Sequence, residues 1–128
     1  MGSATGGDRK RGIGSELALG HLLGDHFDQQ VCIVKTALGT PSLAQDFRPP
    51  GSGAIGKSYT MLLQQIKDSL ANLQNNFPDY TDESEYEVAG LVLNVGEQDT
   101  DAELYAKYLP LLIADLRKEL RTANMPVV

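Results

Sequence analysis

The segment 51–58 has the residue types and the spacing of a phosphate-binding loop. It reads GSGAIGKS, which matches the pattern G-x-x-x-x-G-K-[ST] in full. In such a loop the backbone N–H groups wrap the phosphates, the lysine contacts them, and the serine hydroxyl binds Mg²⁺. Gly56, Lys57 and Ser58 are therefore candidate nucleotide-binding residues. A working loop of this kind must directly follow a buried strand, and the preceding residues 47–50 (FRPP) cannot form one. Nucleotide binding is therefore kept as an alternative.

A different chemistry is indicated by two glycine turns, each of which follows an apolar run. Residues 30–38 lead to Gly39 and Thr40, and residues 86–95 lead to a turn that holds Gln98. A glycine N–H just beyond a parallel strand can stabilise the oxyanion of an acyl-transfer intermediate, and a carboxamide can do the same. Ligands bind where the carboxyl ends of parallel strands meet. We therefore expect Gly39, Thr40 and Gln98 to line an oxyanion or substrate pocket.

Helical and strand-like patterns alternate along the chain and must position these turns. Apolar residues recur with helical spacing in three segments, and short runs rich in Val, Ile and Leu lie between them. Thr100 and Glu103 are expected to form the capping box of the last helix. Alternation of this kind indicates an α/β fold whose parallel sheet is covered on both faces. The sequence predicts helices over 15–27, 59–74 and 100–120, strands over 30–38, 86–95 and 125–128, and a loop over 43–56.

Composition narrows the class of protein further. A chain of 128 residues is long enough for one domain, and its net charge of -6 argues against a nucleic-acid-binding surface. The single cysteine, Cys32, excludes an internal disulfide and a Cys-based zinc site. Because it lies in a strand-like run, we expect Cys32 to be a small buried apolar residue. No metal and no cofactor are expected.

The sequence also lacks membrane and export signals. No apolar run approaches the roughly 20 residues needed to span a bilayer, and the first dozen residues have no apolar signal region. We therefore expect no membrane partner. The Gly-rich residues 1–12 are expected to form a flexible tail, and residues 13–128 a domain. The sequence carries no signal for an oligomeric state.

Five blocks of the sequence form a recognisable series: IGSELALG at 13–20, KTALGTPSLAQDFRPP at 35–50, VAGLVLNVGEQD at 88–99, YAKYLPLLIADLR at 105–117 and NMPVV at 124–128. These blocks resemble the sialate O-acetylesterase family, a branch of the SGNH hydrolases that removes acetyl groups from sugars. They cover nearly all of 12–128 in the family's order, and the most distinctive is KTALGTPSLAQDFRPP at 35–50. In this resemblance the residues 56–59 (GKSY) are only the beginning of the helix after the Arg-Pro-Pro loop.

The resemblance implies the flavodoxin-like SGNH hydrolase fold, a three-layer α/β/α arrangement with a parallel sheet, present here in incomplete form. It also implies a Ser-His-Asp type site, in which the serine attacks an acetyl carbonyl, and an acetylated carbohydrate as substrate. Gly39 matches the family's oxyanion glycine, and Gln98 stands where these enzymes place a carboxamide. Asp46 and Arg48 lie on a proline-stiffened loop, where they could contact sugar hydroxyls or anchor the loop to the domain. Members of this family are often secreted or periplasmic.

The chain departs from the family where the reaction takes place. The family's nucleophile lies in a block that nothing in 1–12 resembles, and its catalytic histidine and aspartate lie beyond residue 128. His21 and His26 fall in the first predicted helix, and we expect them to be surface or packing residues. No catalytic residue is therefore assigned, and the isolated chain is expected to lack esterase activity.

The wall of the expected pocket differs from the family as well. Val95 stands where a glutamine is usual, Leu93 where a tryptophan is usual, and Thr40 where many members have a second glycine. Valine donates no hydrogen bond, so part of the polar wall is missing. Glu97 and Asp99 could orient Gln98 or cap the next helix, and neither is expected to be catalytic.

Three functions follow from these observations. The leading one is part of a carbohydrate O-acetylesterase-like hydrolase domain that acts on sugars such as sialic acid. The second is a non-catalytic glycan-binding or structural relative of that family. The third is a small protein that binds a nucleoside triphosphate through 51–58.

Overall fold

The fold is described from a computed structural model, which covers residues 14–39, 41–81 and 83–128. The expected tail over 1–12 and the predicted pocket residue Thr40 lie outside the described residues. By its internal contacts the chain divides into two compact units, Met1–Gly39 and Thr40–Val128. Each unit is described separately below.

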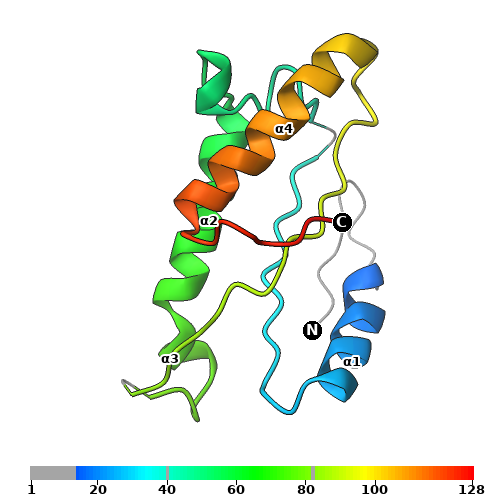
Figure 1. The fold of residues 1–128 in the computed structure, drawn as a ribbon. Coiled ribbons are helices and arrows are strands. Elements are labelled where there is room, and N and C mark those ends of the chain that lie inside the picture. Colours follow the sequence, from blue (N-terminus) through cyan, green and yellow to red (C-terminus); the bar gives the residue numbers. More distant parts are fainter. Residues whose placement is uncertain (1–13, 40, 82) are drawn as a thin grey trace. The chain divides into compact units, whose positions relative to one another are not determined.

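The first unit contains the helix α1 (Ser15–His26), which confirms the first predicted helix (Figure 1). The segment that follows is tied to α1 by its side chains. Lys35 Nζ donates to Glu16 Oε1 at 2.7 Å, and this hydrogen bond holds the pKa of the Glu16 carboxyl below its ordinary value. Gly20 leaves room for Ile33, whose Cδ1 lies 3.4 Å from the position of an added Cβ. No described residue of α1 is buried.

Cys32 does not have the environment expected from its sequence. The expectation of a buried apolar residue is wrong, because Cys32 is exposed and its thiol is free. Neighbouring atoms still remove enough water from the sulfur to raise the pKa of the thiol. Residues 30–38, which were expected to pair as a strand, contain no strand.

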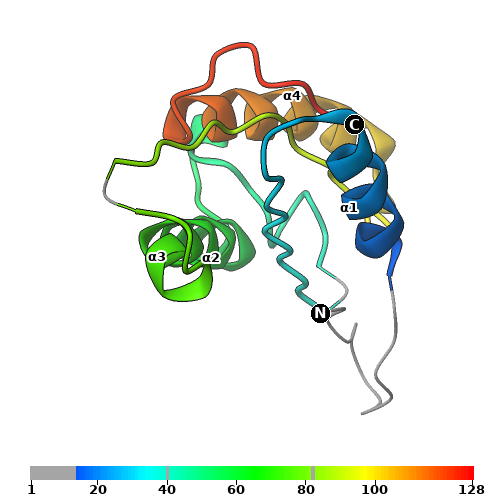
Figure 2. The ribbon, with the colours of Figure 1, turned by 90° about the horizontal axis from the view of Figure 1, so that it is seen from below.

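The described residues of the second unit form three α-helices and a short 3₁₀ helix. These are η1 (Pro50–Ser52), α2 (Lys57–Ala71), α3 (Leu73–Asn76) and α4 (Ala102–Glu119). They confirm the helices predicted over 59–74 and 100–120, although a break at Asn72 separates α2 from α3. Figures 1 and 2 show α4 crossing α2 at an angle. The Lys67 ammonium of α2 lies 3.2 Å from the Glu119 carboxylate of α4.

The core of the second unit is built from side chains of α2, α3, α4 and two irregular segments. The apolar side chains recur with helical spacing on α2 and α4, so each helix buries one face. Leu112 and Leu116 of α4 are completely buried, as are Leu43 of the loop before η1 and Met125 near the chain end. The remaining core residues are Phe47, Tyr59, Leu62, Leu73 and Tyr108.

The first residue of α4 is set by a different cap from the one predicted. The expected capping box of Thr100 and Glu103 is wrong, because the N-cap is Asp101. Its carboxylate accepts hydrogen bonds from the backbone N–H groups of Glu103 and Leu104, both at 3.0 Å. These N–H groups have no partner inside the helix, so the carboxylate satisfies them and also complements the helix dipole.

The expected three-layer α/β/α fold is wrong for this structure. The only β-pairing within 14–39, 41–81 and 83–128 is one parallel bridge between Leu91 and Val127. Around it, Leu93 N donates to Val128 O at 2.7 Å and Val128 N donates to Leu91 O at 3.0 Å. Residues 91–93 and 126–128 therefore run parallel, as predicted, but the described residues form no sheet.

The physical reason lies in what a parallel strand requires. Such a strand is stable when it has neighbours and when helices cover both faces of its sheet. Val92, at the centre of the expected second strand, is 62% exposed, so this segment lacks that cover. An apolar run predicts that a segment can be buried, and it does not supply the partner that buries it.

No helix in the described part of the chain is long and apolar enough to cross a membrane.

Candidate functional site

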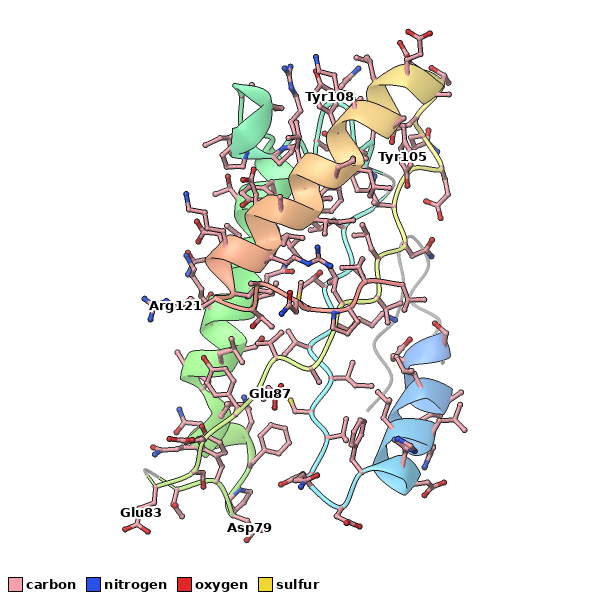
Figure 3. The ribbon with its side chains drawn as sticks, viewed as in Figure 1. Asp79, Glu83, Glu87, Tyr105, Tyr108 and Arg121 are labelled. Carbon is pink, nitrogen blue, oxygen red and sulfur yellow. The ribbon has the colours of Figure 1, made fainter. Side chains whose placement is uncertain are left out.

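The predicted carboxamide, Gln98, lies on a tight turn in the second unit. Gly96 has a φ of 122°, in a region that side-chain-bearing residues rarely adopt, and Asp99 N donates to Gly96 O at 3.0 Å. An added Cβ on Gly96 would collide with the ring of Tyr105. The Tyr105 hydroxyl in turn donates to Val95 O at 3.1 Å, so Tyr105 of α4, labelled in Figure 3, holds the turn against the helix. Gln98 itself is exposed.

The carboxylate of Asp99 joins this turn to the loop 42–48. Its Oδ2 accepts a hydrogen bond from Leu43 N at 2.6 Å, and its Oδ1 accepts one from Ala44 N at 2.8 Å. Both bonds are partly buried and span 55 or more residues of sequence. Hydrogen bonds to an ionised carboxylate are roughly twice as strong as neutral ones. We call this arrangement the Asp99 clamp.

The sequence did not reveal the clamp. The expectations for Asp99 were that it orients Gln98 or caps the next helix, and the cap is Asp101 instead. An aspartate beside a glycine turn gives no indication of which distant N–H groups it will accept. The only available signal was that the two glycine turns were expected to lie near each other.

The loop 42–48 is held in shape by its own side chains. The Asp46 carboxylate accepts hydrogen bonds from Ser42 N at 2.9 Å and from Ser42 Oγ at 3.4 Å. Arg48 Nε donates to Ser52 Oγ at 3.3 Å, and its guanidinium lies 5.1 Å from the centre of the Tyr108 ring. These contacts favour the interpretation that Asp46 and Arg48 anchor the loop. Asp46 remains exposed and Arg48 half-buried.

The structure brings together some of the predicted site residues. The Asp99 clamp places the turn that carries Gln98 beside the loop that carries Asp46 and Arg48. Gly39 is exposed at the end of the first unit, and an added Cβ there would meet no atom within 4 Å. Its assignment to an oxyanion pocket stays a prediction.

The nucleotide-like segment 51–58 uses its backbone donors within the protein. Gly56 N donates to Arg48 O at 2.8 Å, and Ser58 N donates to Asp46 O at 2.9 Å. In a phosphate-binding loop these N–H groups point at the phosphates. Lys57 is exposed on the first turn of α2. Three further donors in the segment are also occupied: Gly51 N by Asp115 Oδ2, Ser52 N by Pro49 O and Gly53 N by Pro50 O.

Neither histidine forms a catalytic pair among the described residues. His21 and His26 are both exposed on α1, and the ring of His26 packs edge-on against Phe27 with centroids 4.9 Å apart. No serine of the described segments donates to either ring. No group of three or more potential metal ligands occurs in the part of the chain that the structure describes.

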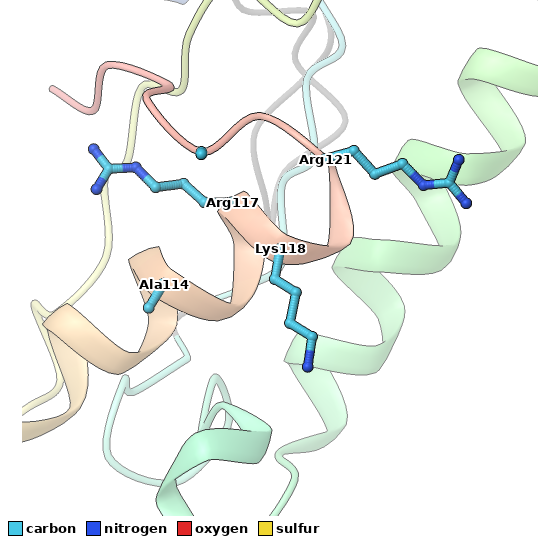
Figure 4. A pocket seen from close by; sticks show the side chains of 5 residues that line it. Ala114, Arg117, Lys118 and Arg121 are labelled. Atoms are coloured by element: carbon cyan, nitrogen blue, oxygen red, sulfur yellow. The ribbon is translucent and has the colours of Figure 1, made fainter.

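An open hollow lies at the C-terminal end of α4 (Figure 4). Arg117 is committed to the fold there, because its Nε and Nη2 donate to Met125 O at 3.0 and 2.8 Å. Basic residues at this end of a helix complement its dipole, which accounts for the charge of the hollow. None of the predicted site residues that the structure describes lines it. The lining residues are Ala114, Arg117, Lys118, Arg121 and Ala123.

Comparison with known proteins identifies the family. Residues 3–128 match the family model described as carbohydrate esterase, sialic acid-specific acetylesterase. No curated protein and no solved structure gave a significant match to the chain. The family match spans nearly the whole chain and agrees with the resemblance seen in the sequence blocks. The chain belongs to the carbohydrate esterase family of sialic acid-specific acetylesterases.

Proposed function

We propose that this chain is part of a carbohydrate O-acetylesterase-like domain, to which it contributes a wall of the substrate pocket and not the nucleophile. The observation that carries the proposal is the family match over residues 3–128. The substrate class is an acetylated sugar such as an O-acetylated sialic acid. In the reaction a serine attacks the acetyl carbonyl, a histidine takes its proton, and N–H donors stabilise the oxyanion.

Within this proposal the residues of the chain have distinct tasks. Gly39 N–H and the Gln98 carboxamide are the candidate oxyanion donors, with Thr40 beside Gly39. Asp46 and Arg48 form the loop next to Gln98, and their internal contacts give that loop a fixed shape. A pocket wall that is ordered before the ligand binds loses less entropy on binding.

Hydrolysis assays test the proposal directly. The isolated chain should not hydrolyse p-nitrophenyl acetate or an O-acetylated sialic acid above the rate of a buffer blank, because no serine–histidine pair is formed by its described residues. Acetate release that saturates with substrate and exceeds the rate of a heat-unfolded sample would contradict the absence of the nucleophile.

A non-catalytic glycan-binding relative is the nearest alternative. Val95 and Leu93 favour it, because their side chains cannot replace the hydrogen-bond donors of the glutamine and tryptophan usual in the family. The coding sequence around this chain distinguishes the two functions. A serine block upstream and a histidine block downstream support the esterase, and their absence supports the glycan-binding relative.

Binding of a nucleoside triphosphate through Gly56, Lys57 and Ser58 is the weaker alternative. The N–H groups of Gly56 and Ser58 already donate to backbone carbonyl oxygens, so binding phosphate there would require these bonds to break. Titration with a fluorescent ATP analogue, using the wild-type chain and Lys57→Ala, should show no Lys57-dependent affinity. A Lys57-dependent affinity would make this alternative the leading function.

A further inference from the structure

We propose that Asp99 is a positioning residue for the carbohydrate site: its carboxylate fixes the turn that carries Gln98 against the loop that carries Asp46 and Arg48. The inference rests on the proposed function and assigns a role to a residue that is not expected to contact the reacting atoms. It follows from the geometry of the second unit alone.

The first step is the strength of the connection. The two oxygens of Asp99 accept from consecutive N–H groups, those of Leu43 and Ala44, at 2.6 and 2.8 Å. Leu43 is completely buried, so its N–H group cannot exchange this bond for water without local opening. Two hydrogen bonds to one carboxylate fix both the distance between the two segments and their relative orientation.

The second step is that both joined segments are stiff on their own. The turn is closed by the bond from Asp99 N to Gly96 O and rests on Tyr105. The loop is closed by the bonds from Asp46 N and Phe47 N to Ser42 O, both at 3.0 Å. Because the turn and the loop 42–48 are each rigid, a change in the hydrogen bonds of Asp99 moves one segment relative to the other without changing the shape of either.

The third step is what the clamp carries. Gln98 is the residue directly before Asp99, and its side chain is exposed. Asp46 lies two residues after Ala44 and is also exposed. The clamp therefore sets the separation between the polar side chains that the proposed function assigns to the substrate. A displacement of these side chains by about 1 Å can weaken their interaction with the substrate as much as the loss of a direct contact does.

The chain provides a closely matched control in Asp101. Its carboxylate also accepts hydrogen bonds from two backbone N–H groups, those of Glu103 and Leu104, only two residues further along. Asp101 caps α4 and does not touch the loop. Asp99→Asn and Asp101→Asn remove the same charge. Asparagine at 99 loses one of the two acceptor oxygens of the clamp, whereas asparagine at 101 keeps an acceptor oxygen for both of its N–H donors, so only the first substitution disturbs the clamp.

The experiment compares the full chain with these two variants by NMR. Asp99→Asn should speed the amide exchange of Leu43 and Ala44 by about tenfold or more, whereas Asp101→Asn should leave these two amides unchanged. Titration with an O-acetylated sialic acid should show about tenfold weaker binding for Asp99→Asn only. The denaturant midpoint should fall for Asp99→Asn and change little for Asp101→Asn, because asparagine is about as good an N-cap as aspartate.

A second substitution separates positioning from folding. Asp99→Glu keeps the charge and both acceptor oxygens but lengthens the side chain by one methylene, so the chain should fold with the loop displaced. We expect Asp99→Glu to bind the carbohydrate more weakly than the wild-type chain does. The control Asp101→Glu should bind it with the wild-type affinity. This variant also provides the test if Asp99→Asn does not fold.

The outcomes distinguish this inference from the function on which it rests. If the wild-type chain binds the sugar and the two Asp99 variants bind it equally well, Asp99 is not a positioning residue, and the proposed function stands. If the wild-type chain binds no acetylated sugar, the proposed function is contradicted and the positioning role with it. If Asp101→Asn weakens binding as much as Asp99→Asn does, the effect comes from the lost negative charge and not from the clamp, and the positioning role is again contradicted.

Discussion

At the scale of single residues, Gly56 explains why a nucleotide-like motif occurs in a chain whose family does other chemistry. An added Cβ on Gly56 would collide with Asp46 O and would lie 2.7 Å from Arg48 N. Glycine is therefore required here for close packing of the backbone, because the loop 42–48 crosses the N-terminus of α2. The carbonyl of Asp46 then accepts from Ser58 N and Tyr59 N, which satisfies donors at the beginning of the helix.

Gly56→Ala should lower the free energy of unfolding by about 1–3 kcal/mol, because backbone atoms cannot move aside as a flexible side chain can. Lys57→Ala is the neighbouring control and should change it by less than about 0.5 kcal/mol, since Lys57 is exposed. Urea denaturation followed by circular dichroism measures both. Equal effects of the two substitutions would contradict the packing role of Gly56.

Tyr59 is a second residue whose environment makes a definite prediction. It is 3% exposed, and its hydroxyl is buried without a hydrogen-bond partner among the described atoms. Burial, together with the negative charges of Asp115 and Glu119, raises the pKa of Tyr59 to about 12. The unfolded chain loses this proton near pH 10, whereas the folded chain keeps it to about pH 12. The contribution of Tyr59 to the free energy of unfolding is therefore fully present below pH 10 and is lost as the pH rises to 12.

Tyr59→Phe should remove that alkaline loss and should raise the free energy of unfolding at pH 7 by about 1 kcal/mol, because no hydrogen bond is lost. Tyr86→Phe is the control, since Tyr86 is 54% exposed. Denaturation curves at several pH values between 7 and 11.5 supply the comparison. If Tyr59→Phe is less stable than the wild-type chain at pH 7, the hydroxyl has a partner and this account of it is wrong.

At the scale of elements, the end of α4 is held by a backbone motif with an unfavourable residue in it. Thr122 N donates to Arg117 O at 3.0 Å and Arg121 N donates to Lys118 O at 3.2 Å, which is the Schellman pattern. Arg121, whose side chain is labelled in Figure 3, has a φ of 55°. This left-handed conformation costs a non-glycine residue about 1–2 kcal/mol.

Arg121→Gly should therefore stabilise the chain by about 0.5–1 kcal/mol, the relief of strain being partly offset by the greater freedom of glycine in the unfolded chain. Lys118→Gly, one turn earlier in the regular helix, should destabilise it by about 1 kcal/mol. Thermal denaturation of the two variants checks the opposite signs. Destabilisation by both substitutions would show that the Arg121 side chain contributes more than its backbone costs.

The elements also show which parts of the fold the sequence could predict. The helices α1, α2 and α4 were predicted because helical periodicity is a local property of each segment. The strands over 30–38 and 86–95 were not confirmed, because a strand depends on partners that its own residues do not specify. Among the described residues, only the bridge between Leu91 and Val127 has the parallel direction that the alternating pattern predicted.

The candidate site, too, could be predicted only in its local features. The turn at Gly96 and the loop 42–48 could be located from glycine and proline spacing, since these residues restrict the backbone locally. The Asp99 clamp could not, because it joins residues 55 or more positions apart. The cap at Asp101 was missed by one residue, since Thr100 and Asp101 are both good N-cap residues and local preference alone does not choose between them.

At the scale of the whole molecule, the second unit contains all of the buried apolar residues that the structure describes. Gln98, Asp46 and Arg48, the residues proposed to form the substrate wall, also belong to that unit, where the Asp99 clamp connects their two segments. A wall of this kind can recognise a sugar without hydrolysing it. Family membership and the geometry of this unit together support the proposal that it recognises an acetylated carbohydrate.

The most direct test is an NMR titration of the full chain with an O-acetylated sialic acid. We predict saturable shifts of the amide signals of Gln98, Asp46 and Arg48, with little change at Lys57 or at the basic hollow around Lys118. The same sugar without its acetyl group should bind more weakly. Shifts confined to residues away from the Gln98 turn, or none at saturating sugar, would contradict the account.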